Sequence, residues 1–382
     1  MLGGISMSKV AIFRCEDYSV SKIQDILMRA LELLDIDLTG YKKLLLKPNL
    51  LTKKRPEEAV TTHPEVLKAL IRILRNSGRD IIVADSPGGP YTSKRLEGIY
   101  EATGIKKVCA EEKVELNYDT SFFETSFDKG NVLKKIPIIM PVKNCDGVIS
   151  VAKLKTHRMA VYTGAVKNLF GLIPGGQKIE FHFRMQELDR FMDLLLDLYL
   201  AISPVFSIID GILAMEGDGP SAGNPRNLGV LIISKDGIAA DYVASQIIGL
   251  KKEDFPLIDR AIKRGLFNPE DVEVLGENIE NLKVKDFKIP LRRDVNFTRG
   301  QLPKFFESLI KNSLTPKPVI MKEKCVGCGE CFMTCPAKAI SIENKKAQID
   351  LLKCIRCYCC HELCPEKAIR IKRFFAFKTL LR

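Results

Sequence analysis

Short apolar runs alternate with amphipathic segments along most of the first 290 residues. Runs rich in Val, Ile and Leu and bounded by Gly, Pro or Asp predict buried strands at 10–15, 44–49, 80–85, 147–154, 205–211 and 228–234. Leu, Ile and Met at helical spacing predict helices at 19–36, 64–76, 185–202 and 238–250, and another from about Ser93. Asp236 is placed to cap the helix at 238–250. This alternation predicts an α/β domain with a mostly parallel sheet over residues 8–295.

Loops that follow the predicted strands are rich in Lys, His and Gly. In a mostly parallel sheet such loops leave the carboxyl ends of the strands, where ligands bind. We therefore expect one cleft to collect Lys47, Asp85, Lys153, His157, Lys167, Asn168 and the backbone of Gly175 and Gly176. Lysines and glycine N–H groups suit an anion, such as a phosphate, nucleotide or carboxylate. The turn 174–176, ending in Lys178, resembles a P-loop, but no Gly-Lys-Ser/Thr sequence follows.

An acidic loop is expected to form the other wall of this cleft. Asp210 stands at a predicted strand end, and Glu216 and Asp218 lie in the Gly-rich loop after it. Their carboxylates can bind Mg²⁺ or orient a substrate, or they simply cap helices and shape turns. The Gly-rich stretch precedes a strand, so it is no dinucleotide-binding fingerprint. His157 is the histidine most suited to a functional role, although a lone histidine is more often structural.

Cysteines dominate the last sixty residues. The pattern C-x-x-C-x-x-C-x-x-x-C-P occurs twice, 29 residues apart, and is typical of ferredoxins that hold two [4Fe–4S] clusters. The fourth cysteine of each copy is expected to ligate the other cluster. One cluster is assigned to Cys325, Cys328, Cys331 and Cys364, and the second to Cys354, Cys357, Cys360 and Cys335. Zinc sites usually show two separated cysteine pairs, and disulfides need an oxidising compartment, so both fit less well.

Charge and composition set the remaining boundaries. The chain carries a net charge of +12, and from residue 311 onward there are 15 Lys/Arg against 6 Asp/Glu. A basic ferredoxin surface favours an acidic redox partner protein, and no nucleic-acid fold signature is present. No apolar run reaches 18 residues and the N-terminus lacks a signal-peptide pattern, so we expect no transmembrane segment. The thiols indicate the cytoplasm, in an oxygen-poor niche.

The predicted domain order follows from these features. A linker is expected at 296–319, where prolines interrupt the pattern, and a two-cluster ferredoxin domain at 320–375. A basic and aromatic tail forms residues 376–382. Cys359 stands where the first copy has Glu330, so it is expected to be a spare thiol.

Several blocks occur together in an order that resembles a known family. They are KPN, T-x-H-P-E-V, VADSPGG, LKTH, TGAVKNLFGLIPG, DGILAMEGDGPSAG and DGIAADYVASQIIGL, between residues 47 and 250. The chain resembles the family named domain of unknown function 362, whose members often carry a C-terminal ferredoxin module and whose substrate is not established. The LKTH to PG stretch is also similar to a block in nickel-pincer lactate racemases. That similarity implies a ligand-facing, catalytic role for His157 and Lys167.

Three functions are compatible with the sequence. The first is an enzyme in which electrons pass through the clusters to an anionic ligand in the α/β domain, for a reduction or a reductive activation. The second is an electron carrier or assembly factor whose α/β domain binds a partner protein. The third is a non-redox enzyme in which the clusters are structural. A small molecule that copurifies with the α/β domain would favour the first.

Overall fold

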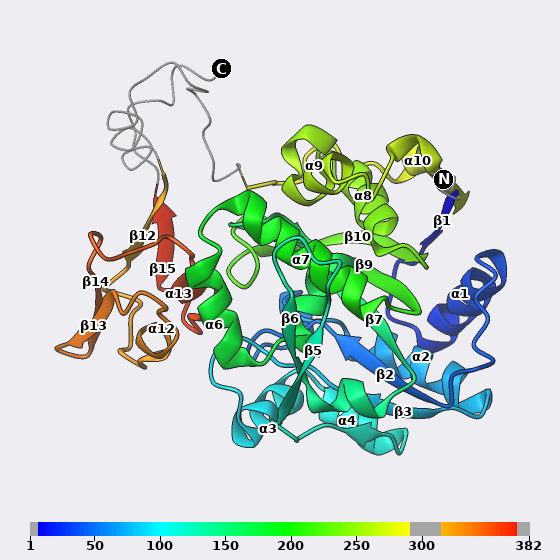
Figure 1. Cartoon of the computed structure of the whole chain (residues 1–382), viewed down its shortest axis with the longest axis horizontal. Coiled ribbons are helices and arrows are strands. Elements are labelled where there is room, and N and C mark those ends of the chain that lie inside the picture. Colours follow the sequence, from blue (N-terminus) through cyan, green and yellow to red (C-terminus); the bar gives the residue numbers. More distant parts are fainter. Residues whose placement is uncertain (1–6, 291–314, 373–382) are drawn as a thin grey trace.

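The computed structural model describes residues 7–290 and 315–372 of this 382-residue chain. A large α/β domain and a small cysteine-rich domain lie side by side, with the small domain next to α6 (Gly175–Arg184) (Figure 1). The predicted tail at 376–382 and most of the predicted linker lie outside the described residues. None of the helices in the described ranges is long and apolar enough to cross a membrane.

The large domain is built on one mixed sheet. Its strand order, among the described residues, is β11-β1-β10-β9-β7-β2-β3-β4. Strand β8 pairs with β7 outside this order. The strands are β1 (Ser8–Arg14), β2 (Lys43–Pro48), β3 (Asp80–Val83), β4 (Glu115–Leu116), β7 (Gly147–His157), β8 (Val161–Thr163), β9 (Phe206–Glu216), β10 (Asn224–Ser234) and β11 (Val272–Gly276). Only the pairings of β10 with β1 and β9, and of β8 with β7, are antiparallel. The predicted α/β class with a mostly parallel sheet is confirmed.

Helices cover both faces of the sheet. One face carries α1 (Val20–Leu33), α2 (Pro64–Asn76), α3 (Ser93–Ala102) and α4 (Ile105–Glu111). The other carries α5 (Ala165–Asn168), α6, α7 (Leu188–Ile202), α8 (Gly237–Ile247) and α9 (Pro256–Lys263), with the hairpin of β5 (Phe122–Ser126) and β6 (Lys135–Ile139). Side chains alternate across a strand, so Leu44 and Leu46 pack under the first set while Leu45 packs under the second. Two buried cores result.

Most predicted elements agree with the structure to within a few residues. The helix α2 spans the predicted 64–76, and Asp236 caps α8 by accepting from the N–H groups of Ile238 and Ala239. The turn predicted at 174–176 is wrong, because Pro174 is the N-cap of the ten-residue helix α6. Glycine weakens a helix interior, but Gly175 and Gly176 occupy its first turn, where little helical hydrogen bonding is lost.

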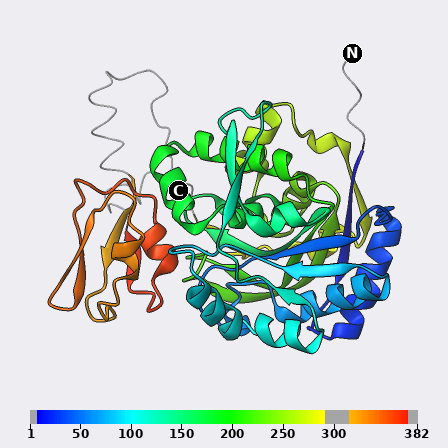
Figure 2. The same cartoon turned by 60° about the horizontal axis from the view of Figure 1, so that its bottom comes forward.

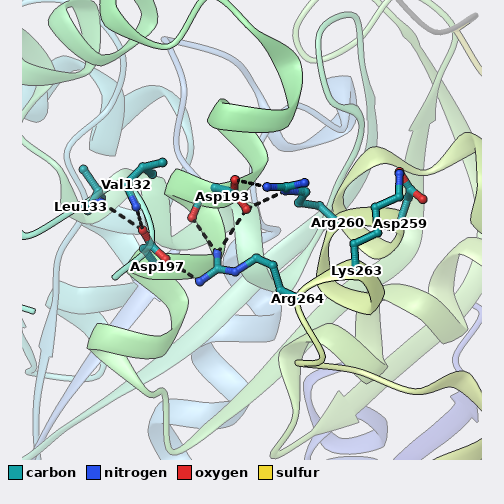
Figure 3. A network of polar contacts seen from close by, with 8 residues as sticks. All are labelled: Val132, Leu133, Asp193, Asp197, Asp259, Arg260, Lys263 and Arg264. Carbon is teal, nitrogen blue, oxygen red and sulfur yellow. Dashed lines mark hydrogen bonds and ion pairs between the residues drawn. The ribbon is translucent and has the colours of Figure 1, made fainter. Parts of the chain in front are cut away.

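A buried ionic network fixes α7 against α9 (Figure 3). Asp193 accepts from both Nε and a terminal nitrogen of Arg260, at 2.8 Å each. Arg264 bridges Asp193 and Asp197, with 2.7 Å to the second carboxylate. Asp197 also accepts two backbone N–H bonds from residues 132–133, just before β6. The network therefore ties the β5–β6 hairpin to the helical layer, since buried carboxylates need such partners.

The small domain has two short antiparallel pairs and two short helices. They are β12 (Lys317–Ile320) with β15 (Ile369–Lys372), β13 (Ile340–Glu343) with β14 (Lys346–Ile349), α12 (Glu330–Met333) and α13 (Cys359–Leu363). The strand β12 begins at Lys317, so the end of the predicted linker contributes a strand to this domain. The two helices lie one in each cysteine repeat.

Candidate functional site

A cavity lies at the junction of the two domains and is lined by residues of α6 and α13. Figure 2 shows the small domain, in orange and red, beside the large domain. The volume of the cavity is about 90 Å³. Its lining includes Lys47, Asn49, Gly88, Gly89, Lys155, His157, Thr163, Lys167, Asn168, Gly175, Lys178, His182, Pro220, Thr334, Cys359, Glu362 and Leu363. Strands β2 and β7 place Lys47 and Lys155 near their carboxyl ends, as expected of a ligand site on parallel strands. The structure therefore brings together Lys47, His157, Lys167, Asn168 and Gly175 from the predicted site.

Lys47 is held in a closed polar cluster at the base of this cavity. Its Nζ lies 2.8 Å from Oδ1 of Asp85 and donates to Oδ1 of Asn168 at 3.1 Å. The amide of Asn168 donates to the Lys47 carbonyl and to Ser150, both at 3.0 Å. Asp85 also accepts from the Leu50 N–H at 2.8 Å. Because its charge is neutralised and its donors are used, Lys47 shapes the site more than it attracts a ligand.

Three other lysines of the cavity have no carboxylate partner among the described residues. Lys155 donates to the carbonyl of Val60 at 2.6 Å, and Lys178 donates to the carbonyl of Ser86. Lys167, which is partly exposed, makes no hydrogen bond or ion pair within the described ranges. Burial lowers the pKa of all three ammonium groups, to about 7 for Lys178. When these three lysines are protonated, the cavity therefore carries positive charge that no described carboxylate neutralises at ion-pair distance.

His157 joins the two domains across the cavity. Its Nδ1 accepts from the backbone N–H groups of Met159 and Ala160, both at 3.1 Å, which leaves the proton of the neutral ring on Nε2. Nε2 lies 3.1 Å from Oε1 of Glu362 on α13. Burial lowers the pKa of His157 to about 4, so the imidazole is neutral at pH 7. Burial opposes ionisation of Glu362, but His157 and Lys167 outweigh it and lower its pKa to about 2.

His182 is the second histidine of the cavity. It packs against Phe191, with ring centroids 5.0 Å apart, and edge-on against Phe170 at 5.6 Å. Its Nδ1 is buried and has no hydrogen-bond partner among the described residues. Burial lowers the pKa of His182 to about 4. A buried ring nitrogen without a partner is uncommon, so this atom is available to a ligand in the cavity.

The cysteines of the small domain gather in the two predicted groups. One small cavity is lined by Cys325, Cys328, Cys331 and Cys364, and another by Cys335, Cys354, Cys357 and Cys360. The backbone N–H groups of Ala339 and Ala368 donate to the sulfurs of Cys335 and Cys364, both at 3.2 Å. Such N–H bonds stabilise thiolates, and four thiolates around each space fit a [4Fe–4S] cluster.

The second of these groups adjoins the basic cavity. Cys359 lines the cavity and lies between the predicted ligands Cys357 and Cys360. Thr334, which precedes Cys335, lines it as well. Residues adjacent in sequence to the predicted cluster ligands Cys335 and Cys360 therefore form part of the cavity wall.

Five predicted site residues lie elsewhere. Lys153 faces Asp210 directly across the β7–β9 pair, and its Nζ lies 2.9 Å from that carboxylate. The acidic loop does not line the cavity with its carboxylates: Glu216 accepts from the backbone of Lys288, and Asp218 pairs with Arg158. Gly176 is not part of the lining either. Lys153 and Lys155 are two residues apart, a spacing that would place both side chains on one face of a regular strand. A register shift between them gives the two side chains different surroundings.

Polar and apolar contacts dock the small domain over the cavity. Arg95 at the start of α3 donates to both carboxylate oxygens of Glu330, at 3.1 and 2.9 Å. Nε2 of His361 lies 3.3 Å from the carbonyl of Asp218. A Cβ atom on Gly88 would lie 2.8 Å from a methyl carbon of Leu363, so the two domains pack closely at this point. These contacts make α13 a wall of the site, which no loop pattern in the α/β domain indicates.

Some residues of the site were not among the predicted site residues. Asn49 and Thr163 each place a buried oxygen without a hydrogen-bond partner, among the described residues, in the cavity lining. Asn49 follows the strand that carries Lys47, so its position at a strand end was a usable signal. Glu362 lies between two cluster cysteines, and no local pattern connects it with the α/β domain.

Comparison with known proteins identifies both parts of the chain. Residues 44–246 match the model of the domain of unknown function (DUF362), and residues 317–365 match that of the 4Fe-4S dicluster domain. A thylakoid-associated protein of Synechocystis sp. is 32% identical over 292 residues, which cover 74% of this chain and 88% of that protein.

Two solved structures are more distant. A protein from Thermotoga maritima shares 16% identity with a TM-score of 0.37, and the match covers 61% of this chain and 59% of that one. The lactate racemase apoprotein from Thermoanaerobacterium thermosaccharolyticum shares 13% identity with a TM-score of 0.38, over 62% of this chain and 57% of that one. Each match thus spans less than two thirds of the solved chain.

Proposed function

Because the chain belongs to the DUF362 family and carries a [4Fe–4S] ferredoxin-type domain, we propose that it reduces an anionic small molecule with electrons from two clusters. The molecule binds in the basic cavity between the domains. One observation carries the proposal: α13 forms a wall of the lysine-lined cavity and also holds the cysteine Cys360 expected to ligate a cluster. The electron source and the binding site would then share one helix.

The electron and proton balance defines what the proposal requires. When bound, the two [4Fe–4S] clusters supply one electron each. Reduction of a carbonyl group or an activated C=C bond takes these two electrons and two protons. A low-potential, one-electron carrier protein must then restore the electrons, and the basic ferredoxin region favours an acidic carrier. The free cysteines fit a cytoplasmic setting, which is part of this proposal.

The residues of the cavity have distinct parts in this scheme. Lys167, which lacks a partner within the described ranges, binds the anion, while Lys47, Asp85 and Asn168 fix the floor of the cavity. The pKa of Lys178 lies at about 7, so its ammonium group can give one of the two protons to the reduced ligand at neutral pH, and solvent water supplies the second. His157 keeps its proton on Nε2 toward Glu362 and so fixes α13 beside the bound molecule.

The proposal is tested by anaerobic stopped-flow absorbance. Protein with reduced clusters is mixed with 2-oxo acids, α,β-unsaturated carboxylates and aldehyde phosphates, and cluster reoxidation is followed. One of these classes should reoxidise the clusters with saturable kinetics. Lys167→Met should raise the ligand concentration that gives half the maximal rate at least tenfold.

A matched control is Lys106→Met, which removes an exposed ammonium group paired with Glu97 outside the cavity. It should behave as the wild type. If none of the three classes reoxidises the clusters faster than buffer, the reductase proposal is wrong. An electron carrier whose α/β domain binds a partner protein would then be the better account.

A further inference from the structure

The lysines of the molecule divide into neutralised and unneutralised sets. Lys47 lies 2.8 Å from Asp85, and Lys153 lies 2.9 Å from Asp210, so each buried ammonium has its own carboxylate. Lys155, Lys167 and Lys178 face the cavity without such a partner in the described ranges. Burying one ammonium group without a counter-ion is costly, and three in one cavity also repel one another.

One carboxylate faces these three lysines. Glu362 lines the cavity, but its Oε1 lies 3.1 Å from His157, and no described lysine approaches it within ion-pair distance. His157 and His182 are neutral at pH 7, because burial lowers the pKa of each to about 4. With all three lysines charged, the lining therefore carries two positive charges in excess. A ligand with two negative charges would balance it.

Independent evidence for a missing ligand comes from buried polar atoms. Oδ1 of Asn49, Oγ1 of Thr163 and Nδ1 of His182 line the cavity and have no hydrogen-bond partner among the described residues. The N-terminus of the ten-residue helix α6 also reaches the cavity at Gly175, and its N-cap, Pro174, provides no side-chain bond. Free N–H groups at a helix start favour anions, particularly phosphate-like ones.

We infer that the cavity binds a compact dianionic molecule, a phosphate monoester or a dicarboxylate, through Lys155, Lys167 and Lys178. This inference rests on the proposed function, because it narrows the ligand of the same site. The three ammonium groups hold the doubly charged group, and the unpartnered oxygens and ring nitrogen bond to the rest of the molecule. Monoanions leave one positive charge unbalanced and bind more weakly.

Proton uptake should accompany binding. The charged and titratable groups around Lys178 are Asp85, Lys47, Lys167 and His182, and burial holds the pKa of Lys178 at about 7. Above that pH much of the Lys178 population is neutral. A bound dianion favours the ammonium form and raises this pKa, so binding at pH 8 takes up protons from the buffer.

The experiment is isothermal titration calorimetry of the anaerobic holoprotein at pH 8 in chloride medium. The probes are inorganic phosphate, malonate and acetate, and two buffers of different ionisation enthalpy report the proton uptake. Phosphate or malonate should bind at least tenfold more tightly than acetate, with net proton uptake. Phosphate alone identifies a phosphate ester site, malonate alone a dicarboxylate site, and both a general dianion site.

Variants assign the binding to the named lysines. Lys167→Met should weaken dianion binding at least tenfold, and Lys106→Met should not change it. The inference is overturned if acetate binds as tightly as the dianions, if neither dianion binds, or if Lys167→Met has no effect. The comparison of dianions with acetate uses the wild-type protein, so it does not depend on whether a variant folds. Dianion binding without cluster reoxidation by any anion would refute only the reductase proposal.

Discussion

Lys153 provides a test of how buried charge is organised in this fold. The Lys153→Met variant removes the ammonium group that lies 2.9 Å from the carboxylate of Asp210, where both side chains are fully buried. Asp210 keeps two strong donors, the hydroxyl of Tyr18 at 3.0 Å and the backbone N–H of His63 at 3.0 Å. The variant thus leaves a buried carboxylate with hydrogen bonds but without a counter-ion.

The size of the effect follows from that environment. Removing one partner of a buried ion pair costs about 3–5 kcal/mol in the free energy of unfolding. Because two donors remain on Asp210, we expect the lower end, about 3 kcal/mol. The double variant Lys153→Met/Asp210→Asn removes the unbalanced charge. Its amide oxygen can still accept from the backbone N–H of His63, while its NH2 group can donate to the hydroxyl oxygen of Tyr18. The double variant should recover at least half of the loss.

The measurement is urea unfolding followed by far-UV circular dichroism on anaerobic holoprotein. The slope with denaturant should stay the same in all variants, so that the midpoints report stability. A loss below about 1 kcal/mol for Lys153→Met, or a double variant no more stable than the single one, would refute the ion-pair reasoning. Dianion binding should survive in Lys153→Met, because Lys153 does not line the cavity.

Three further predictions address the clusters, the scaffold and the histidines. Cys357→Ser should lose about four iron and four sulfide per chain, whereas Cys359→Ser should retain the wild-type content, as measured by iron and acid-labile sulfide analysis. Asp197→Ala removes one of the two carboxylate partners of Arg264 and the acceptor of two backbone N–H groups, so urea unfolding should show a loss of about 2–4 kcal/mol. Neutral His182 has a pKa of about 4 against an ordinary value of 6.5, so the unfolded state binds the extra proton between these pH values and stability falls as the pH drops through them. His182→Phe should therefore gain stability relative to the wild type from pH 6.5 down to pH 4, and an unchanged difference across that range would contradict the burial argument.

Features encoded over short distances were readable in the sequence. Strands and helices such as α2 follow from apolar spacing, because each element buries one face or stripe against the core. The cysteine groups could be predicted because ligand spacing within each repeat is local, and the exchanged fourth cysteine is a regular property of two-cluster ferredoxins. Lys47, His157 and Lys167 could be placed near one another because parallel strands expose their carboxyl ends at one edge.

The division of the lysines into neutralised and unneutralised groups was decided only by the tertiary structure. Lys153 and Lys155 are two residues apart on β7, yet Lys153 meets Asp210 across the sheet and Lys155 faces the cavity. Which carboxylate neutralises a lysine depends on strand order, register and the bulge between these positions, and residue spacing does not encode them. Glu362 reaches the site from the small domain, through contacts between residues far apart in the sequence. The sequence by itself thus determined the elements and the ligand types, while long-range packing determined which charges remain for a ligand.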